Sequence, residues 1–357
     1  MKEIEQLVRK NIIALKAYSS ARDEFKGETL SSNHTIFIDA NENPLGSVGF
    51  AQSYNRYPDP TQRSLKDEIA KLKNTKADTI FLGNGSDEAI DLLIRIFCEP
   101  QKDTILITPP TYGMYEVAAN INDVGIERVL LRESDFGISA ENILAKITPH
   151  TKLIFLCSPN NPTGNLLKRD DIVRILQTFT GIVVIDEAYI DFAETPSWIA
   201  TLQHYPRLVV LQTFSKAWGL AGLRLGMAFA HPMIIQLINK VKPPYNINQA
   251  TQEIALTVLK QKNDYQKHLQ TLIAERVKLY DNLTRMPLFE KVFPSEANFV
   301  LVRPKTDAQQ LYDYLISQSI IVRNRSSQPL CQNTLRLSVG SPAENELLIE
   351  KLRQFSI

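Results

Sequence analysis

The sequence is poor in the residue types that form metal sites and disulfide frameworks. It contains five scattered histidines and three cysteines, Cys98, Cys157 and Cys331, among 357 residues. The cysteines are far apart and show no CxxC spacing, which argues against both a disulfide framework and a zinc site. The histidines show no ligand spacing either, so we expect them to be surface or packing residues. We therefore predict no metal site and a reducing, cytoplasmic location.

The chain also lacks a surplus of charge of either sign and a long apolar run. Lys and Arg number 40 against 39 for Asp and Glu, so the net charge of +1 offers no footprint for nucleic acid or an anionic membrane. The N-terminus mixes charges from its second residue, unlike a signal peptide, and no later stretch approaches membrane length. We expect small metabolites as partners, with neither nucleic acid nor membrane.

The pattern of apolar residues predicts an α/β protein. A chain of this length is too long for one ordinary core and suits a large domain with a smaller companion. Short β-branched runs alternate with helical patterns such as 86–97 and 168–179, which is typical of a mostly parallel sheet covered by helices. We expect seven strands, at 79–82, 104–108, 127–131, 152–156, 182–185, 208–211 and 225–230.

The pattern changes near residue 250. A long amphipathic helix is expected from about Ala250 to Asn282, followed by strands at 298–302 and 334–338. We predict a large domain over 46–249 and a small α+β domain over 250–357. The first 45 residues are expected to form an amphipathic helix, a loop and one strand, as an arm that contributes to the small domain.

Lys216 is the candidate nucleophile. It follows an apolar strand, beside Ser215, at the position where strands of an open α/β sheet deliver ligand-binding residues. A free amine with a pKa near ~10.4 is a poor nucleophile at neutral pH, and a cation or an apolar pocket lowers that pKa. Arg224 could supply the cation and also hold a phosphate. Three glycines in the same segment allow close backbone approach and unusual backbone angles: Gly219, Gly222 and Gly226.

Two further segments place polar groups at the ends of predicted strands. Asp186 ends the run 182–185, where a buried carboxylate needs a cationic partner, although it could also cap the next element. The segment 83–88 joins a strand to a helix N-terminus, where a phosphate is stabilised. The segment 158–164 contains two prolines and a glycine and predicts a tight loop.

Together these segments resemble the fold type I pyridoxal phosphate (PLP) aminotransferases. The matching motifs are Thr213 to Gly226, Asp186-Glu-Ala-Tyr189, Ser158 to Gly164, Gly83 to Glu88 and Tyr112 in Pro109 to Gly113. The resemblance implies PLP held as a Schiff base on Lys216, with Asp186 on the ring nitrogen and with Tyr189 and Asn161 donating hydrogen bonds to the phenolic oxygen. It also implies that Tyr112 stacks on the ring, and that the cofactor phosphate is bound by Gly85, Ser86, Asp87, Ser215 and Arg224.

Further stretches resemble the histidinol-phosphate aminotransferase family over essentially the whole chain. They include Arg56 to Pro60, Val241 to Asn246, Ala297 to Val300, Ile321 to Arg325 and Leu335 to Gly340. The implied substrates are histidinol phosphate and glutamate or 2-oxoglutarate. Their anionic ends would be clamped by Arg323 and Arg336, with Tyr18 adding a hydroxyl and Asn298 lying near the reacting end. Tyr57 would reach the cofactor phosphate of the other subunit, which implies a homodimer with shared active sites.

The sequence departs from the family at Trp218 and Met227, where phenylalanine and another aromatic are expected, so the packing around Lys216 should differ. Three alternatives stay open at this point. They are a threonine-phosphate decarboxylase or an aromatic amino acid aminotransferase of the same fold, and a non-catalytic PLP or metabolite-binding regulator. The presence of Lys216 together with Asp186, and the lack of a basic face, count against the regulator.

Overall fold

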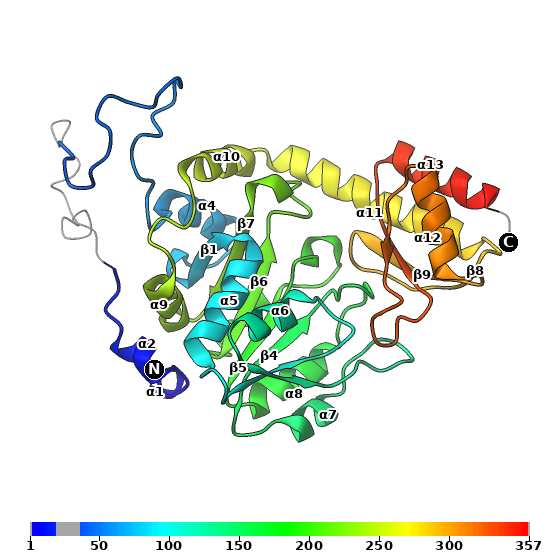
Figure 1. Ribbon diagram of the computed structural model, residues 1–357, viewed down its shortest axis with the longest axis horizontal. Helices are drawn as coiled ribbons and strands as arrows, with labels where there is room; N and C mark the ends of the chain where they lie inside the picture. The colour runs from blue at the N-terminus through cyan, green and yellow to red at the C-terminus, as the bar shows by residue number, and fades with distance from the viewer. Residues whose placement is uncertain (1, 19–35, 356–357) are drawn as a thin grey trace.

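The computed structural model describes residues 2–18 and 36–355, which contain a large sheet in the middle of the molecule and a small one at the end away from the N-terminus (Figure 1). The large sheet has the strand order β1-β7-β6-β5-β4-β2-β3, and the small one has the order β10-β11-β9-β8. The strands of the large sheet are β1 Ile80–Asn84, β2 Thr104–Ile107, β3 Gly125–Arg128, β4 Thr151–Cys157, β5 Ile182–Asp186, β6 Leu208–Thr213 and β7 Leu225–Ala230. The strands of the small sheet are β8 Phe289–Val292, β9 Phe299–Pro304, β10 Arg323–Asn324 and β11 Leu335–Ser338.

The large sheet confirms the predicted α/β class. Strands β2 to β6 pair in parallel, whereas β7 runs antiparallel to both β6 and β1. The predicted strand 225–230 coincides with β7, and the others overlap with the observed strands. The prediction was least accurate for the edge strand, which lies at 125–128 and not at 127–131. Because β4, β5 and β6 are parallel neighbours, their carboxyl ends meet at one edge of the sheet.

Helices cover both faces of the large sheet. One face packs against α5 (Gly85–Phe97), α6 (Met114–Ile121) and α9 (Pro232–Val241). The other packs against α4 (Arg63–Lys73), α7 (Ala140–Lys146) and α8 (Arg169–Thr178). The central strand β5 is buried along its whole length, and each buried Ile or Val side chain stabilises the fold by about 1.5–3 kcal/mol. The site at the sheet edge therefore rests on a rigid support.

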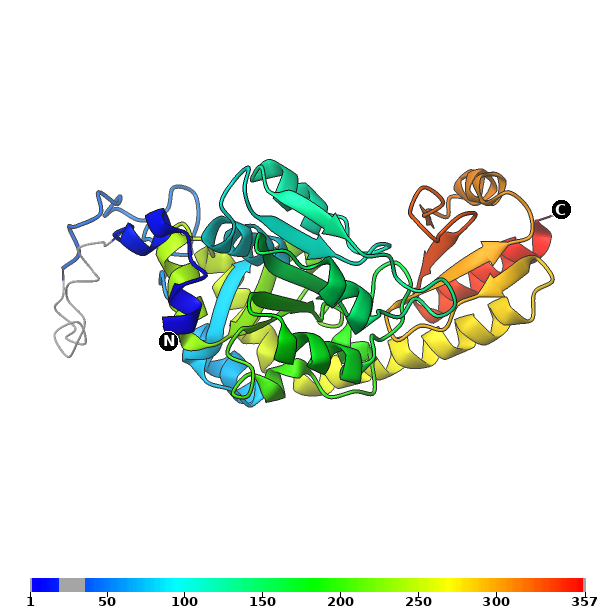
Figure 2. The same ribbon diagram turned by 90° about the horizontal axis from the view of Figure 1, so that it is seen from below.

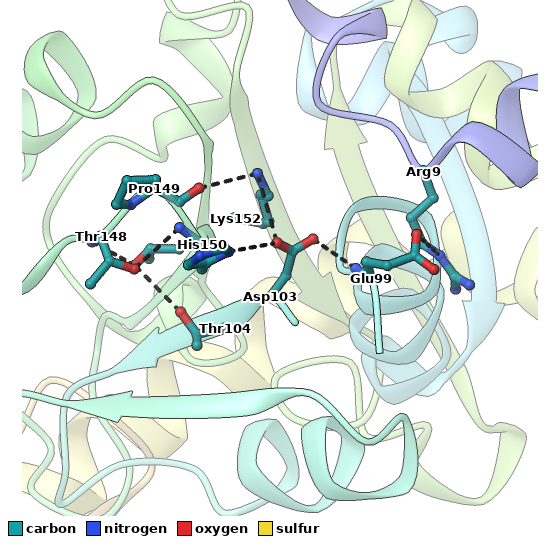
Figure 3. Close-up of polar contacts among 9 residues, drawn as sticks. Arg9, Glu99, Asp103, Thr104, Thr148, Pro149, His150 and Lys152 are labelled. Carbon is teal, nitrogen blue, oxygen red and sulfur yellow. Dashed lines mark hydrogen bonds and ion pairs between the residues drawn. The ribbon is translucent and has the colours of Figure 1, made fainter. Parts of the chain in front are cut away.

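The N-terminal arm begins with two short helices, α1 (Lys2–Glu5) and α2 (Lys10–Ala14). Ile4, Val8 and Ile12 pack into the helix layer of the large sheet. Arg9 joins this contact by donating to the carbonyl oxygen of Arg95 at 3.0 Å and pairing with Glu99 at 3.4 Å, next to the polar network around Asp103 (Figure 3). Within residues 2–18 and 36–45 the expected strand is not found, and the arm's contribution to the small domain stays a prediction.

The predicted long helix from 250 to 282 is in fact two helices, α10 (Gln249–Leu259) and α11 (Lys262–Thr284). Helix α10 packs on α4, whereas α11 packs on β8, β9 and α13 (Pro342–Gln354). The break between the two helices, at Lys260 and Gln261, thus separates the part that packs on the large domain from the part that packs on the small one. Figure 2 shows α11 running from the large domain out to the small one, which α12 (Ala308–Ser317) and α13 complete.

Candidate active site

Side chains from five separate segments line one cavity at the carboxyl edge of β4, β5 and β6 and the start of α5. Its lining consists of Gly85, Ser86, Asp87, Tyr112, Cys157, Asn161, Asp186, Ala188, Tyr189, Thr213, Ser215, Lys216, Ala221 and Arg224. The structure thus brings together every residue predicted to bind the cofactor within one chain. Cys157, Ala188, Thr213 and Ala221 were not predicted.

Lys216 follows β6 and lies at the centre of this cavity. Its Nζ atom is 5.5 Å from the centroid of the Tyr189 ring. Burial lowers the pKa of Lys216, and the positive charge of Arg336 lowers it further. Arg224, the cation expected from the sequence, contributes less than Arg336 does. Both mechanisms expected for lowering this pKa are therefore present, but the main cation comes from the small domain.

Asp186 ends β5 with only 2% of its surface exposed. One carboxylate oxygen accepts a hydrogen bond from the Tyr115 hydroxyl at 2.7 Å, and the other accepts one from the backbone N–H of Ala188 at 3.0 Å. Burial raises the pKa of Asp186, because an unpaired charge is costly in an apolar surrounding. The carboxylate therefore lacks the strong cationic partner that would stabilise its charged form.

Tyr115 is a site residue that the sequence prediction missed. It is fully buried, stacks on Phe155 with ring centroids 4.8 Å apart, and meets Tyr112 edge-on at 5.6 Å. Tyr115 lies in the first turn of α6, and no pattern in the sequence distinguishes it from an ordinary core tyrosine.

The turn into α5 brings Asp87 against Tyr112 and Arg224. Asp87 accepts a hydrogen bond from the Tyr112 hydroxyl at 3.0 Å and pairs with Arg224 at 3.3 Å. Gly226 passes so close to this turn that a Cβ would lie 2.1 Å from the backbone nitrogen of Ser86. On the far side, the hydroxyl of Ser215 accepts a hydrogen bond from Thr213 at 3.0 Å.

The three glycines of the lysine segment do not share one role. Gly226 is required by close packing, and Gly219 adopts a φ of +66° that side chains disfavour. A Cβ at Gly222 would lie in open space, so packing within the chain does not require glycine there, and its close approach to a cofactor stays a prediction.

The small domain adds polar groups from the opposite side. Arg336 on β11 donates from Nη1 to the amide oxygen of Asn161 at 2.6 Å and lies 5.1 Å from the Phe299 ring. Arg323 on β10 pairs directly across from Arg336 and is exposed. Asn298 immediately precedes β9, and its carbonyl oxygen accepts from Val339. The Arg336 to Asn161 bond joins the two domains at the cavity.

Five predicted residues are absent from the lining of this cavity, namely Asn298, Arg323 and Arg336 of the small domain and the two tyrosines Tyr18 and Tyr57. Tyr18 is 70% exposed, and Tyr57 is 50% exposed. Tyr57 stacks on Tyr245 with ring centroids 4.5 Å apart, beside a second cavity of about 570 Å³ that also contains Arg56 and Glu42. Their roles stay predictions, as do those of the residues inside the cavity.

Trp218 and Met227, which depart from the family pattern, are both buried. Trp218 stacks on Tyr265 of α11 with ring centroids 3.9 Å apart and also packs against Phe214. Trp218 therefore links the lysine segment to the helix that carries the small domain. Met227 lies in β7, opposite Leu82 of β1.

The cavity fits pyridoxal phosphate. This group carries a cationic ring nitrogen, which suits the buried and under-compensated carboxylate of Asp186. It also carries a phosphate, which suits the N-terminus of the 13-residue helix α5, where Gly85 leaves no room for a Cβ beside Arg224. Its aldehyde carbon requires an amine of lowered pKa, and Lys216 provides one.

Two searches of the described residues gave no candidates. Within 2–18 and 36–355 no group of His, Cys, Asp and Glu side chains could hold a metal ion. No helix in the same ranges is long and apolar enough to cross a membrane.

The fold and the cavity define a PLP-dependent transferase of the type I fold. The sequence profile of the family "Aminotransferase class I and II" matches residues 29–352. The histidinol-phosphate aminotransferase of Cytophaga hutchinsonii is 51% identical over 352 residues, which cover 99% of each chain. The chain therefore belongs to the class I and II aminotransferases and, within them, to the histidinol-phosphate aminotransferase family.

Solved structures agree with this assignment. The crystal structure of the histidinol-phosphate aminotransferase from Clostridium acetobutylicum superposes with a TM-score of 0.77 at 28% identity, covering 84% of this chain and 90% of that one. The enzyme of the same name from Sinorhizobium meliloti, solved in complex with pyridoxal-5'-phosphate, also gives 0.77, at 23% identity and with coverages of 89% and 90%. At that identity the second comparison supports the fold alone.

Proposed function

We propose that the enzyme transfers an amino group between L-histidinol phosphate and 2-oxoglutarate, giving imidazole-acetol phosphate and L-glutamate, as a step of histidine biosynthesis. The observation that carries this proposal is the position of Arg336, which brings a partly buried cation from the small domain to the cavity of Lys216. Both substrates end in an anion, and one arginine-lined site can bind each in turn. The names of relatives about half identical to this chain support the same reaction.

The residues of the chain have distinct tasks in this proposal. Bound pyridoxal phosphate supplies an electron-withdrawing ring that stabilises negative charge on the substrate carbon which loses its proton. Lys216, whose lowered pKa favours the neutral amine, would take the proton from that carbon and carry it, acting first as general base and then as general acid. Asp186 holds the proton on the ring nitrogen, and the hydrogen bond from Tyr115 keeps its carboxylate in place.

Asn161 and Tyr189 would hold the phenolic oxygen of the ring. The amide oxygen of Asn161 is already bonded to Arg336, so its NH2 group is the part that remains to donate. Burial raises the pKa of Tyr189, which keeps its hydroxyl protonated and able to donate. Gly85, Ser86, Ser215 and Arg224 would bind the cofactor phosphate.

We also propose that the enzyme works as a homodimer. The described part of the segment 36–57 exposes an unusual number of large apolar side chains, and such a patch marks an interaction surface. They are Ile36, Ile38, Leu45, Val48, Phe50, Tyr54 and Tyr57. A second copy of this chain would cover them and receive Tyr57 at its cofactor phosphate. The proposed location remains the cytoplasm, in keeping with three buried, free cysteines.

The dimer can be tested by sedimentation and by mixing variants. K216A and Y57A should each be inactive or weak as homodimers. Co-refolded or co-expressed, they should regain activity, because one site of a hybrid dimer then has both Lys216 and Tyr57. A monomer in sedimentation, or no recovery on mixing, would contradict the shared site.

The reaction can be tested by following the visible absorbance of the purified holoenzyme. Histidinol phosphate should change the absorbance of the bound cofactor, and 2-oxoglutarate should restore it. Phenylalanine and threonine phosphate serve as parallel controls. A response to phenylalanine alone would favour an aromatic aminotransferase, carbon dioxide released from threonine phosphate would favour a decarboxylase, and no response to any amine would favour a binding protein.

A further inference from the structure

Three arginines lie on the same face of the small sheet. Arg323 of β10 pairs directly opposite Arg336 of β11, so their side chains emerge on one face. The backbone N–H of Arg325 donates to the carbonyl oxygen of Thr334 at 2.9 Å, which continues the pairing beyond β10. Arg325 is two residues from Arg323 in this extended segment, and side chains two apart point to the same side. Since Arg336 reaches Asn161 from this face, the face is turned toward the cavity of Lys216.

No carboxylate neutralises these arginines. Within residues 2–18 and 36–355, none of the three forms an ion pair with Asp or Glu, and the guanidinium of Arg325 donates no hydrogen bond. The Nε atoms of Arg325 and Arg336 are both buried without a partner. Buried donors of this kind are normally satisfied, so their lack of protein partners points to a ligand anion.

The electrostatics of Arg325 place it close to the reacting groups. Burial, and then the charges of Arg336 and Arg323, lower the pKa of Arg325 to about 10. The side chain of Tyr189 opposes this shift, so it too lies within electrostatic range. Arg323, by contrast, is exposed. Of the two arginines on the β10 side, Arg325 is therefore the one that is partly buried, with its Nε atom inaccessible to solvent.

The turn that follows Arg325 also contains buried polar atoms that have no hydrogen-bond partner. The hydroxyl of Ser326 and the side-chain oxygen of Gln328 are buried and lack partners, while the backbone of the turn is closed by a hydrogen bond from Gln328 to the carbonyl of Arg325 at 2.9 Å. Backbone hydrogen bonds therefore hold both Arg325 and Gln328, while buried side-chain atoms of the same turn remain without partners. Such atoms are free to bind a ligand at this turn.

We propose that Arg325 binds the phosphate end of the amino substrate, as a third guanidinium beside Arg323 and Arg336, and that it favours a phosphate monoester over a carboxylate. The inference rests on the proposed function. A phosphate monoester carries close to two negative charges and three outer oxygens, which can use several guanidinium groups. A carboxylate has one charge and two oxygens, which a single arginine fork satisfies. Arg336 can therefore serve both substrates, whereas Arg325 is needed only for the phosphate.

The test compares R325Q and R325K with the control R353Q in the holoenzyme. Arg353 is exposed on α13 of the same domain, so R353Q removes an equal charge away from the sheet face. In R325Q the KM for histidinol phosphate should rise about tenfold or more, while the KM for 2-oxoglutarate and kcat change less than about threefold. R325K should recover part of the loss, because it restores the charge but not the fork. R353Q should match the parent enzyme.

Inorganic phosphate gives a second readout that does not depend on turnover. Titration calorimetry should show binding to the holoenzyme weakened about tenfold in R325Q and unchanged in R353Q. Melting temperatures and cofactor absorbance, measured on each variant, identify a folding defect. Should R325Q fail to fold, R325K carries the test through its KM and its affinity for phosphate.

The inference is wrong if R325Q leaves the KM for histidinol phosphate unchanged, or raises the KM values for both substrates equally. Its failure is distinguishable from failure of the proposed function. If the parent enzyme does not use histidinol phosphate at all, the proposed function falls. If the parent enzyme uses it and R325Q does so equally well, only the role of Arg325 falls.

Discussion

The two sides of the active site are built differently. On the large domain, Asp186 and Lys216 directly end or follow parallel strands whose neighbours fix their backbone by hydrogen bonds. On the small domain, the arginines extend toward the cavity from another sheet through long side chains, and within residues 2–18 and 36–355 their one side-chain hydrogen bond to the large domain is that from Arg336 to Asn161 at 2.6 Å. The first side suits chemistry that needs fixed positions, and the second suits recognition of two different substrates at one place. Variants on the first side should therefore lower kcat for both substrates, and variants on the second should alter KM.

The largest effect is expected for K216A. Lys216 is the amine of lowered pKa in the cavity, and loss of a group that transfers the proton lowers the rate by more than about 10³-fold. Single-turnover kinetics with each substrate separately should show the same loss in both directions. Normal turnover in K216A would overturn both the proposed role of Lys216 and the contrast between the two sides.

Substitution of Asp186 by Asn should have the next largest effect. The amide keeps the shape of the side chain but cannot hold a proton on the ring nitrogen by its charge, so we expect kcat to fall about 10²- to 10³-fold for both substrates. Steady-state kinetics with histidinol phosphate and with glutamate would measure it. A loss confined to one substrate would place Asp186 on the recognition side instead.

R336Q should raise KM for both substrates by about 10- to 100-fold, because each loses a charged hydrogen bond at its anionic end. It should also raise the pKa of Lys216, since the charge of Arg336 lowers that pKa in the parent enzyme. The pH dependence of lysine modification in the apoprotein would report this change. A fall in kcat without any change in KM would contradict the assignment of Arg336 to recognition.

Y115F should have the smallest effect, less than about tenfold in kcat at neutral pH, the scale of one lost hydrogen bond. In the parent enzyme, the hydrogen bond from the Tyr115 hydroxyl lowers the pKa of Asp186 and so opposes the effect of burial. Without that bond the pKa of Asp186 rises further, and protonation of the carboxylate begins at higher pH. The acid side of the pH profile should therefore move upward. A profile identical to that of the parent enzyme would exclude Tyr115 from positioning Asp186.

The same contrast explains which parts could be predicted from the sequence. Strand ends are visible as the boundary between apolar and polar residues, so the sequence could place Asp186, Lys216 and the turn at Gly85 at one edge of the sheet, and all three line the same cavity. Tyr115 was missed because its helix face is decided by packing against Phe155. The break at Gln261 was missed because the apolar period continues through it while the packing partners change.

Arg325 was missed for a related reason. Strand β10 has only two residues, so it shows no alternation of apolar and polar residues. Its partner β11 begins only after the connecting segment 325–334. Arg325 and Thr334 become neighbours only through that pairing. The predicted roles of Tyr18 and Tyr57 involve surfaces outside the cavity of a single chain.

The bond between Arg336 and Asn161 has a further consequence for binding. The amide oxygen of Asn161 takes only Nη1 of the guanidinium, while the buried Nε has no partner among the described residues and is left to donate to an anion. An incoming anion therefore meets an arginine that the large domain has already oriented, so less side-chain freedom is lost on binding. The interdomain contact thus preorganises the recognition side before any substrate arrives.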